Sequence, residues 1–326
     1  MPEGDTRGNP GDNLILPFRI ESHALRGRLA RLGGVVDAIL SRHDYPEPVA
    51  QLLGETVALA ALLAATMKYD GIFTLQAKGD GPVNLLVADV TSSGDVRGYA
   101  GYDADALREA VAGPTLAPVP MLLGAGYLAF TVDQGAHTER YQGIVELIGG
   151  TLAACAHHYF RQSEQLDAAI YLAAGRTGED SAWRAGGLML QHVPPEGGKA
   201  EHDWDLDDQI DDEGWRESVA LMGTVSEREL LRPGLPPHDL LYRLFHEVGV
   251  RAFRPKRLAD NCRCSRDRVS NTLASLPRAE IEDCKVDGSG EVVVTCEFCS
   301  TAYRFDDRAL AALYEGGVAD SGVEAV

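Results

Sequence analysis

Two pairs of cysteines near the C-terminal end constrain this chain more than any other feature of its sequence. Cys262 and Cys264 stand in N-C-R-C-S, Cys296 and Cys299 stand in T-C-E-F-C, and 31 residues separate the pairs. Two close thiol pairs that a folded segment brings together make a four-sulfur tetrahedral site, which suits zinc. One pair has the spacing C-x-C, whereas zinc-ribbon knuckles use C-x2-C at both ends. The sequence therefore predicts one Zn²⁺ ion bound by these four residues.

Such a site has two interpretations. In the common interpretation, the zinc has a purely structural role and only stabilises the fold of a small domain. In the other, the four sulfurs form a switch, because zinc holds cysteines as thiolates, the form that oxidants attack. With a Zn–S bond of about 2.3 Å the sulfurs lie about 3.8 Å apart, and a disulfide needs about 2.05 Å. A small movement after metal loss would join a pair, and it would remove on the order of 10–16 kcal/mol of metal-binding energy.

Length and charge narrow the range of functions. The chain has 326 residues, enough for two or three domains, and 45% of them are apolar, as is typical of globular proteins. It carries 49 acidic and 30 basic residues, and its net charge of −19 argues against nucleic-acid binding. The longest apolar run, Val57 to Met67, is too short to span a membrane. Paired thiols without a signal peptide predict a cytoplasmic protein.

The element pattern predicts an α+β fold, with an N-terminal α/β domain over residues 14–195 that combines a mixed β-sheet with packed helices. A polar, Gly- and Pro-rich segment, 1–13, precedes it and is expected to be disordered. Pro17 makes the first strand, 14–20, an expected edge strand. Ser22 is expected to cap a helix through Leu25, Leu29 and Leu32. Further strands are expected at 72–77, 83–90, 96–99, 127–132, 142–148, 168–173 and 187–192, and further helices at 48–67 and 152–163.

A linker is predicted over residues 196–258. Glu201 to Glu213 holds eight acidic residues and no Lys or Arg, and mutual repulsion disfavours its compaction. Beyond it, Trp215, Val219, Met222 and Val225 follow at i, i+4, i+7 and i+10, one stripe of a helix. This stripe is a candidate client or linker surface, and ordinary core packing is the alternative. A short amphipathic helix is expected at 240–248.

The C-terminal zinc domain is predicted over residues 259–316, followed by a tail at 317–326. Ser265 is expected to cap a helix that Pro277 ends, and D-G-S-G predicts a hairpin with the second cysteine pair just beyond it. A unit of this size has a marginal core, so the metal decides whether it folds. Seven basic residues from Arg251 to Arg268 offset the charge of the thiolates, form a solvated basic face, or form a nucleic-acid patch, which the overall charge and the lack of interleaved aromatics disfavour. Cys284 lies outside the cysteine motif.

Five segments carry a resemblance to a known family. Two surround the thiols, C-R-C-S-R-D-R-V and C-E-F-C-S-T-A-Y-R-F, and the others are Y-F-R-Q-S-E-Q, G-G-L-M-L-Q and L-L-Y-R-L-F-H-E. With these segments the chain resembles the redox-regulated heat-shock protein 33 family of bacteria. The resemblance runs from about Leu14 to about Glu315. It implies an ATP-independent holdase chaperone that binds unfolding proteins under oxidative stress. It further implies zinc on the four cysteines in the reduced state and disulfides Cys262–Cys264 and Cys296–Cys299 on oxidation. Zinc loss would then unfold the C-terminal segment and destabilise the linker, and the active form would be a homodimer.

Two other functions remain open from the residues. A thiol-disulfide oxidoreductase would use Cys296 and Cys299, although such a pair is expected at a helix start in a βαβ unit. A zinc-ribbon nucleic-acid binder is disfavoured by the net charge. No nucleophile–base constellation supports an enzyme.

Overall fold

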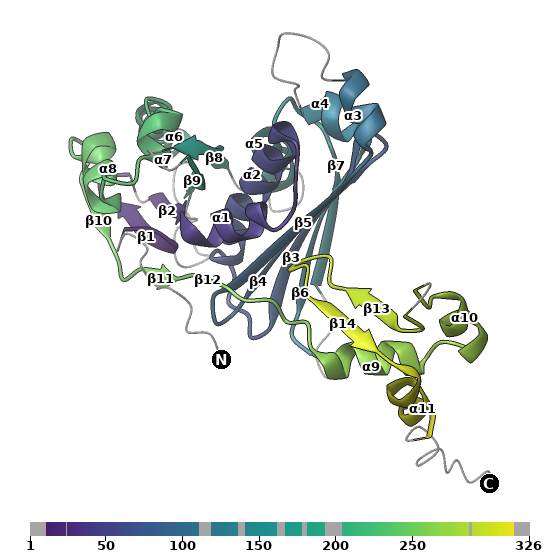
Figure 1. Cartoon of the computed structure of the whole chain (residues 1–326). Helices are drawn as coiled ribbons and strands as arrows, with labels where there is room; N and C mark the ends of the chain where they lie inside the picture. Colours follow the sequence, from purple (N-terminus) through teal and green to yellow (C-terminus); the bar gives the residue numbers. More distant parts are fainter. Residues whose placement is uncertain are drawn as a thin grey trace, which may run out of the picture. The chain divides into compact units, whose positions relative to one another are not determined.

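The computed structural model describes residues 11–23, 25–110, 119–135, 141–161, 167–177, 181–192, 204–286 and 289–315, with only the backbone described for 204–212 and 315. The chain divides into two compact units, 1–261 and 262–326 (Figure 1). Helices and sheets occur in both, which confirms the predicted α+β class. The expected tail lies outside the described residues, as does the expected disordered segment up to residue 10.

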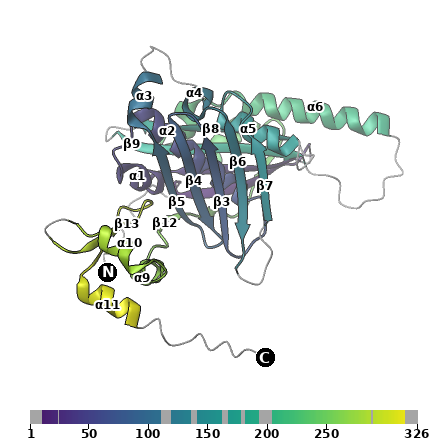
Figure 2. The same ribbon diagram turned by 90° about the vertical axis from the view of Figure 1, so that its right-hand side faces the viewer.

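Two sheets form the first unit. In sheet A the strands run in the order β10 (Val250–Ala252), β1 (Leu14–Ile20), β2 (Leu25–Leu32), β9 (Ala182–His192) and β8 (Ala168–Thr177), and β11 (Lys256–Arg257) also pairs with β1. In sheet B the order is β12 (Ala259–Asp260), β5 (Asp95–Tyr102), β4 (Val83–Thr91), β3 (Ile72–Gly79), β6 (Gly126–Asp133) and β7 (Tyr141–Glu146), shown face on in Figure 2. All pairings are antiparallel except β12 with β5.

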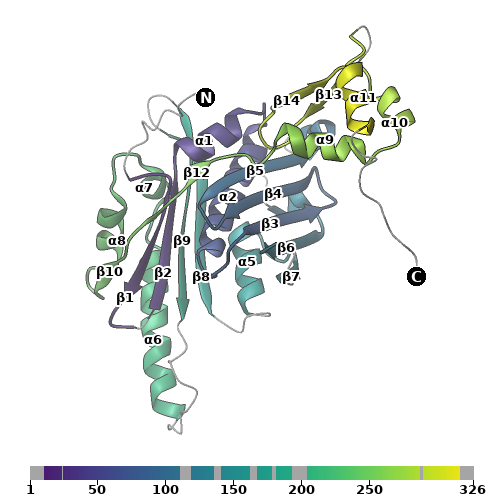
Figure 3. The ribbon, with the colours of Figure 1, turned by 90° about the horizontal axis from the view of Figure 1, so that it is seen from below.

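A buried helix, α2 (Glu47–Ala64), lies between the two sheets (Figure 3). Its Ala and Leu residues pack on the inward faces of both sheets together with α1 (Gly34–Ser41) and α5 (Leu152–Tyr159). By length and composition α2 could cross a membrane, but 78% of it is buried inside the unit, as expected of a core helix. Two short helices, α3 (Ala104–Ala110) and α4 (Val119–Leu123), lie at one end of sheet B.

Three helices from the predicted linker cover the opposite face of sheet A, and we call them the linker helices: α6 (Trp204–Met222), α7 (Glu227–Leu231) and α8 (Pro237–Phe245). The face they cover presents Leu14, Leu16, Phe18 and Ile20 of β1, Leu25 and Leu29 of β2, and Leu188 and Leu190 of β9. The helices contribute Met222, Leu230, Leu231, Leu240, Leu241, Leu244 and Phe245. The sheet is thus apolar on both faces, and the linker helices bury the second one (Figure 3).

The second unit contains α9 (Arg266–Ala274), α10 (Arg278–Asp283), a hairpin of β13 (Val292–Thr295) and β14 (Ala302–Phe305), and α11 (Asp307–Glu315). As expected, Ser265 caps α9, because its side chain accepts a hydrogen bond from the N–H of Arg268. Among its described residues, five side chains form a buried core: Leu273, Ile281, Val292, Phe305 and Leu310.

Four expectations about elements are wrong. Residues 25–32 form β2 instead of a helix, because Leu25, Leu29 and Leu32, at helical spacing, belong to a strand buried on both faces. The strand with Pro17 is internal, and Pro17 falls between its partners β10 and β11, where its carbonyl accepts from the N–H of Phe253 and its missing N–H leaves no strand bond unmade. Val225 lies beyond the end of α6. Much of the acidic block is helical, since α6 begins at Trp204.

Candidate metal and redox centre

Two loops of the second unit carry the four cysteines. Cys262 and Cys264 lie in the segment that leads into α9. Cys296 and Cys299 lie beyond the D-G-S-G segment, as expected, in the turn between β13 and β14. The turn is closed by two backbone hydrogen bonds: the N–H of Cys296 donates to the carbonyl of Thr301 at 3.0 Å, and the N–H of Ser300 donates to the carbonyl of Cys296 at 2.8 Å. The second pair therefore forms a knuckle held by a hairpin.

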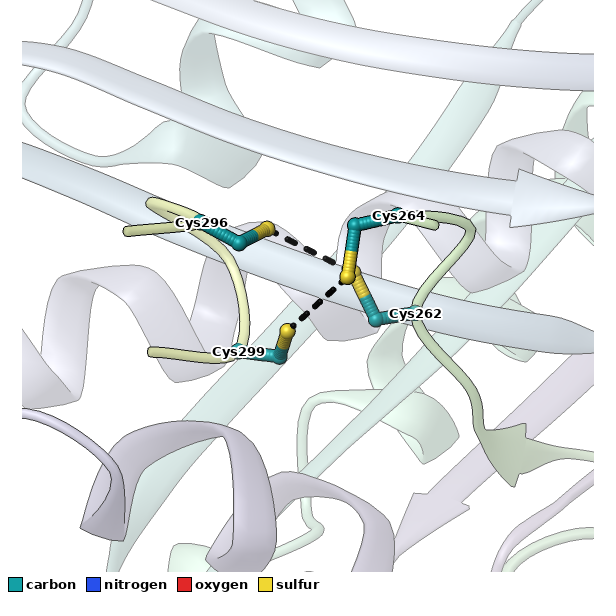
Figure 4. Close-up of side chains that lie close together, drawn as sticks. All are labelled: Cys262, Cys264, Cys296 and Cys299. Atoms are coloured by element: carbon teal, nitrogen blue, oxygen red, sulfur yellow. Dashed lines mark hydrogen bonds between the residues drawn. The ribbon is translucent and has the colours of Figure 1, made fainter. Parts of the chain in front are cut away.

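The four sulfurs converge on one point (Figure 4). All four Sγ atoms lie within 4.8 Å of one another. The Cys264 and Cys299 sulfurs are 3.3 Å apart, and those of Cys262 and Cys296 are 3.7 Å apart. A tetrahedral zinc ion with Zn–S bonds of about 2.3 Å requires sulfur separations of about 3.8 Å. The cluster thus fits a zinc site and a redox centre in both its donor chemistry and its spacing.

The protein environment distinguishes the thiols. Burial raises the pKa of Cys264 to about 12, although the Tyr303 hydroxyl donates to its sulfur at 3.1 Å and opposes this effect. Burial also acts to raise the pKa of Cys299, but hydrogen bonds to Thr301 and the neighbouring thiols outweigh it and lower that pKa to about 7. The Cys299 sulfur lies 3.2 Å from the Thr301 hydroxyl. Of the cluster thiols Cys264, Cys296 and Cys299, only Cys299 has a lowered pKa, so in the metal-free protein it ionises more readily than the other two.

The other two cysteines of the chain lie outside the cluster. Cys284 is exposed at the end of α10, and Cys155 is buried in α5. Arg266 stacks over the ring of Phe305, and Arg268 donates to the backbone carbonyl of Arg263 at 3.0 Å. Both arginines thus help to pack the loop around Cys264, and their effect on the thiolates stays a prediction.

The apolar stripe of the linker packs towards sheet A, within the first unit. Met222 and Val225 are each 4% exposed, and Trp215 packs half-buried against the same cluster of sheet A and linker side chains. Val219 is also half-buried. All four therefore have the burial of packing residues in this conformation, and a role in client binding stays a prediction.

Comparison with known proteins places these features in a family. The family model described as "Hsp33 protein" matches residues 13–306. The 33 kDa chaperonin of Caulobacter vibrioides is 41% identical over 297 residues, which cover 90% of this chain and 95% of the relative. That of Pseudomonas fluorescens (strain SBW25) is 39% identical over 312 residues, covering 96% and 97%.

A solved structure agrees with the sequence relatives. The crystal structure of the Hsp33 homologue of Thermotoga maritima superposes with a TM-score of 0.75 at 25% identity, and the match covers 94% of this chain and 99% of that one. Fold, cysteine cluster and relatives together define a heat-shock molecular chaperone. The chain belongs to the Hsp33 family.

Proposed function

We propose that this protein is a redox-regulated, ATP-independent holdase, which is inactive when reduced and zinc-bound and is activated by disulfide formation with zinc release. The observation that carries the proposal is the convergence of four cysteine sulfurs within 4.8 Å in a unit whose described residues include a buried core of five side chains. So small a core leaves the fold of the unit dependent on its metal. A reaction at the sulfurs therefore changes the conformation of the whole unit.

The zinc would be held by Cys262, Cys264, Cys296 and Cys299, and it would keep the thiolates together and offset their charge. Each disulfide forms when two thiols lose two electrons to an oxidant such as a peroxide, which leaves as water. Four thiols thus reduce two equivalents of peroxide. A disulfide bonds only two sulfurs, so the tetrahedral ligand set is lost and the metal leaves.

The pairing of the disulfides is a separate question. We propose Cys262 with Cys264 and Cys296 with Cys299, because partners this close in sequence meet even after the unit has unfolded. In the reduced structure the short contacts run across the cluster, from Cys264 to Cys299 and from Cys262 to Cys296. Peptide mapping of the oxidised protein distinguishes the two patterns, and a Cys264–Cys299 linkage would contradict the pairing.

Clients would bind to surface that the linker helices bury in the resting state. Fully burying one large apolar side chain stabilises the folded state by about 1.5–3 kcal/mol. The linker helices bury several of their own side chains against sheet A, among them Leu240, Leu244 and Phe245 of α8. Release of these helices would expose apolar residues on both partners. We propose that this surface, including Trp215, Val219, Met222 and Val225, holds unfolding proteins in the cytoplasm, and that the active form is a homodimer.

An oxidoreductase function has less support. Thiol pairs that exchange disulfides catalytically gain a low pKa from the start of a helix, whereas Cys296 and Cys299 lie in a turn between antiparallel strands. Binding of unfolded proteins requires no catalytic group, so we propose that the protein is not an enzyme.

Light scattering of a heat-unfolded client tests the function. The protein is compared in its reduced, zinc-loaded form and after peroxide at mild heat, and released zinc is followed in the same tube. Suppression of scattering is expected only together with zinc release. The variant Cys262→Ser is expected to bind no zinc and to suppress scattering without oxidant. The matched control Cys284→Ser alters an exposed thiol outside the cluster and is expected to behave like the parent. Zinc release without suppression would contradict the holdase.

A further inference from the structure

Three buried charged residues lie at one end of the face of sheet A that the linker helices cover. Arg31 of β2 is 1% exposed and Arg184 of β9 is 8% exposed, and Asp12, which precedes β1, is 3% exposed. The rest of that face is apolar. Asp12 Oδ1 lies 2.5 Å from Arg184 Nη2 and 3.5 Å from Arg31 Nη2. Two cations and one anion therefore share a site that excludes water.

The arginines bind the backbone of the linker. Arg31 Nη1 donates to the carbonyl of Leu235 at 2.6 Å, and its Nη2 donates to the carbonyl of Arg232. Arg184 Nε donates to the carbonyl of Leu231 at 2.6 Å. These three carbonyls belong to the end of α7 and the turn before α8. Carbonyls at the end of a helix have no partner within it, and here the partners come from sheet A.

The cluster is electrically incomplete without the linker. Two guanidinium groups and one carboxylate leave a net charge of +1 in a buried position. Burial lowers the pKa of Arg31 to about 10, with Asp12 opposing and Arg184 adding to the effect, so the group stays charged at neutral pH. A buried charge that loses its partners is strongly unfavourable. The three linker carbonyls therefore supply acceptors to Arg31 Nη1, Arg31 Nη2 and Arg184 Nε, which water cannot reach in this buried position.

This contact differs in kind from the packing around it. Apolar contacts are non-directional, so helices that slide keep much of their stabilisation. The bonds from Arg31 and Arg184 require the carbonyls of residues 231, 232 and 235 at fixed positions. A small displacement of α7 would break all of them together and admit water. The linker helices are thus held in one position on sheet A, because a small shift loses the arginine–carbonyl bonds without forming others.

We infer that Asp12, Arg31 and Arg184 form a polar latch that fixes α7 and the following turn to sheet A, and that this latch sets how readily the linker helices leave the sheet. In terms of the proposed holdase function, on which this regulatory role rests, the latch would be an autoinhibitory contact within the first unit.

Hydrogen exchange of the reduced, zinc-loaded full chain tests the latch. In Arg31→Met the apolar stem remains and the two carbonyl bonds are lost. Amides of the linker helices between residues 215 and 245 are expected to exchange about tenfold faster or more, the loss expected for bonds to a charged donor. Amides of α2 are expected to keep their rates, because they do not depend on α7.

The same strand provides a matched control. Arg28 of β2 donates to the carbonyl of Ala65 at 3.0 Å and to Gln191 Oε1 at 2.7 Å, both outside the linker. Arg28→Met is expected to lower thermal stability without selectively accelerating the linker amides. If Arg31→Met folds poorly, Arg184→Lys keeps the charge but lacks the Nε donor to Leu231, and the same selective acceleration is expected.

Two results would overturn the latch. One is exchange of the linker amides at parental rates in both Arg31→Met and Arg184→Lys. The other is the same selective acceleration of these amides in Arg28→Met. The holdase function is decided separately, by scattering with the oxidised parent. If the oxidised parent did not suppress scattering, the holdase function would fail, and the exchange rates of the variants would still decide whether the latch exists.

Discussion

Arg42, at the end of α1, forms a two-pronged ion pair with Asp260, the last residue of β12. Arg42 Nη1 donates to Asp260 Oδ1 at 2.9 Å, and Nη2 contacts Oδ2. The side chains are 28% and 16% exposed. Asp260 stands two positions before Cys262, so the chain is fixed to sheet B immediately before the cysteine cluster begins.

Arg42→Ala should therefore weaken the first unit. Loss of paired bonds between charged groups is expected to lower the free energy of unfolding by about 1–3 kcal/mol, measured by thermal or urea denaturation. Zinc content should not change, because no ligand is touched. As a control, Arg108→Ala removes an ion pair to Asp105 whose side chains are 76% and 82% exposed. That variant is expected to change stability by less than about 0.5 kcal/mol, and an equal effect would contradict the role of Arg42.

Metal removal should unfold one unit and spare the other. A chelator added to the reduced protein is expected to abolish hydrogen-exchange protection in α9, α11 and the β13–β14 hairpin, since the part of this unit that the structure describes has a core of five buried side chains. The α2 amides, in the large core of the first unit, should keep their protection. Persistent protection of the hairpin in metal-free protein would show that its core suffices alone.

The raised pKa of Glu55 in α2 should make the stability of the protein depend on pH. Burial raises its pKa to about 7, and Glu227 of α7 adds to the effect. Below pH 4.5 the group is protonated in both states and contributes nothing. As the pH rises from 4.5 to about 7, the unfolded chain loses the proton first, so the folded state loses stability. Glu55→Gln should relieve this penalty, by up to about 3 kcal/mol at pH 8, and show no gain at pH 4. Melting curves at both values decide it, and a gain that is equal at both would contradict the assignment.

A methyl group at Gly27 should disturb the face under the linker. Gly27 of β2 pairs with Phe18 of β1, whose ring covers it and stacks on Phe245 of α8 with centroids 5.6 Å apart. An added Cβ would overlap the Phe18 ring. Gly27→Ala is expected to cost about 1–3 kcal/mol, seen as a lower urea midpoint. Gly150→Ala, where an added Cβ meets nothing within 4 Å, is the control and should be near neutral.

The cysteine cluster could be predicted because its chemistry is local. Two short spacings, C-x-C and C-x2-C, are enough to bring four thiols to one metal, and the structure places all four within 4.8 Å. The second pair lies just beyond the strand that follows D-G-S-G, as predicted, but the hairpin that holds it, β13 with β14, was not predicted. Residues on both sides of the cysteines form that hairpin, so the D-G-S-G signal alone could not indicate it.

The latch could not be predicted, since its members have no common sequence signal. Asp12 stands in a stretch whose composition indicates disorder, and Arg31 lay on an expected helix. The helical spacing of Leu25, Leu29 and Leu32 also fits a strand once neighbouring strands bury both of its faces, as β1 and β9 do here. The pairing with β9 depends on residues more than 150 positions away and overrides the local pattern.

The late strands of sheet A impose an order on biosynthesis. β10 and β11 pair with β1, and Arg257 donates to the carbonyl of Asp12, 245 positions earlier in the chain. A ribosome that adds about 5–20 residues per second needs roughly 10–50 s to make the intervening segment. During that time β1 has no partner on one side, and an unpaired strand edge invites association with other chains. A protein proposed to guard others from aggregation thus passes through its own vulnerable interval each time it is translated.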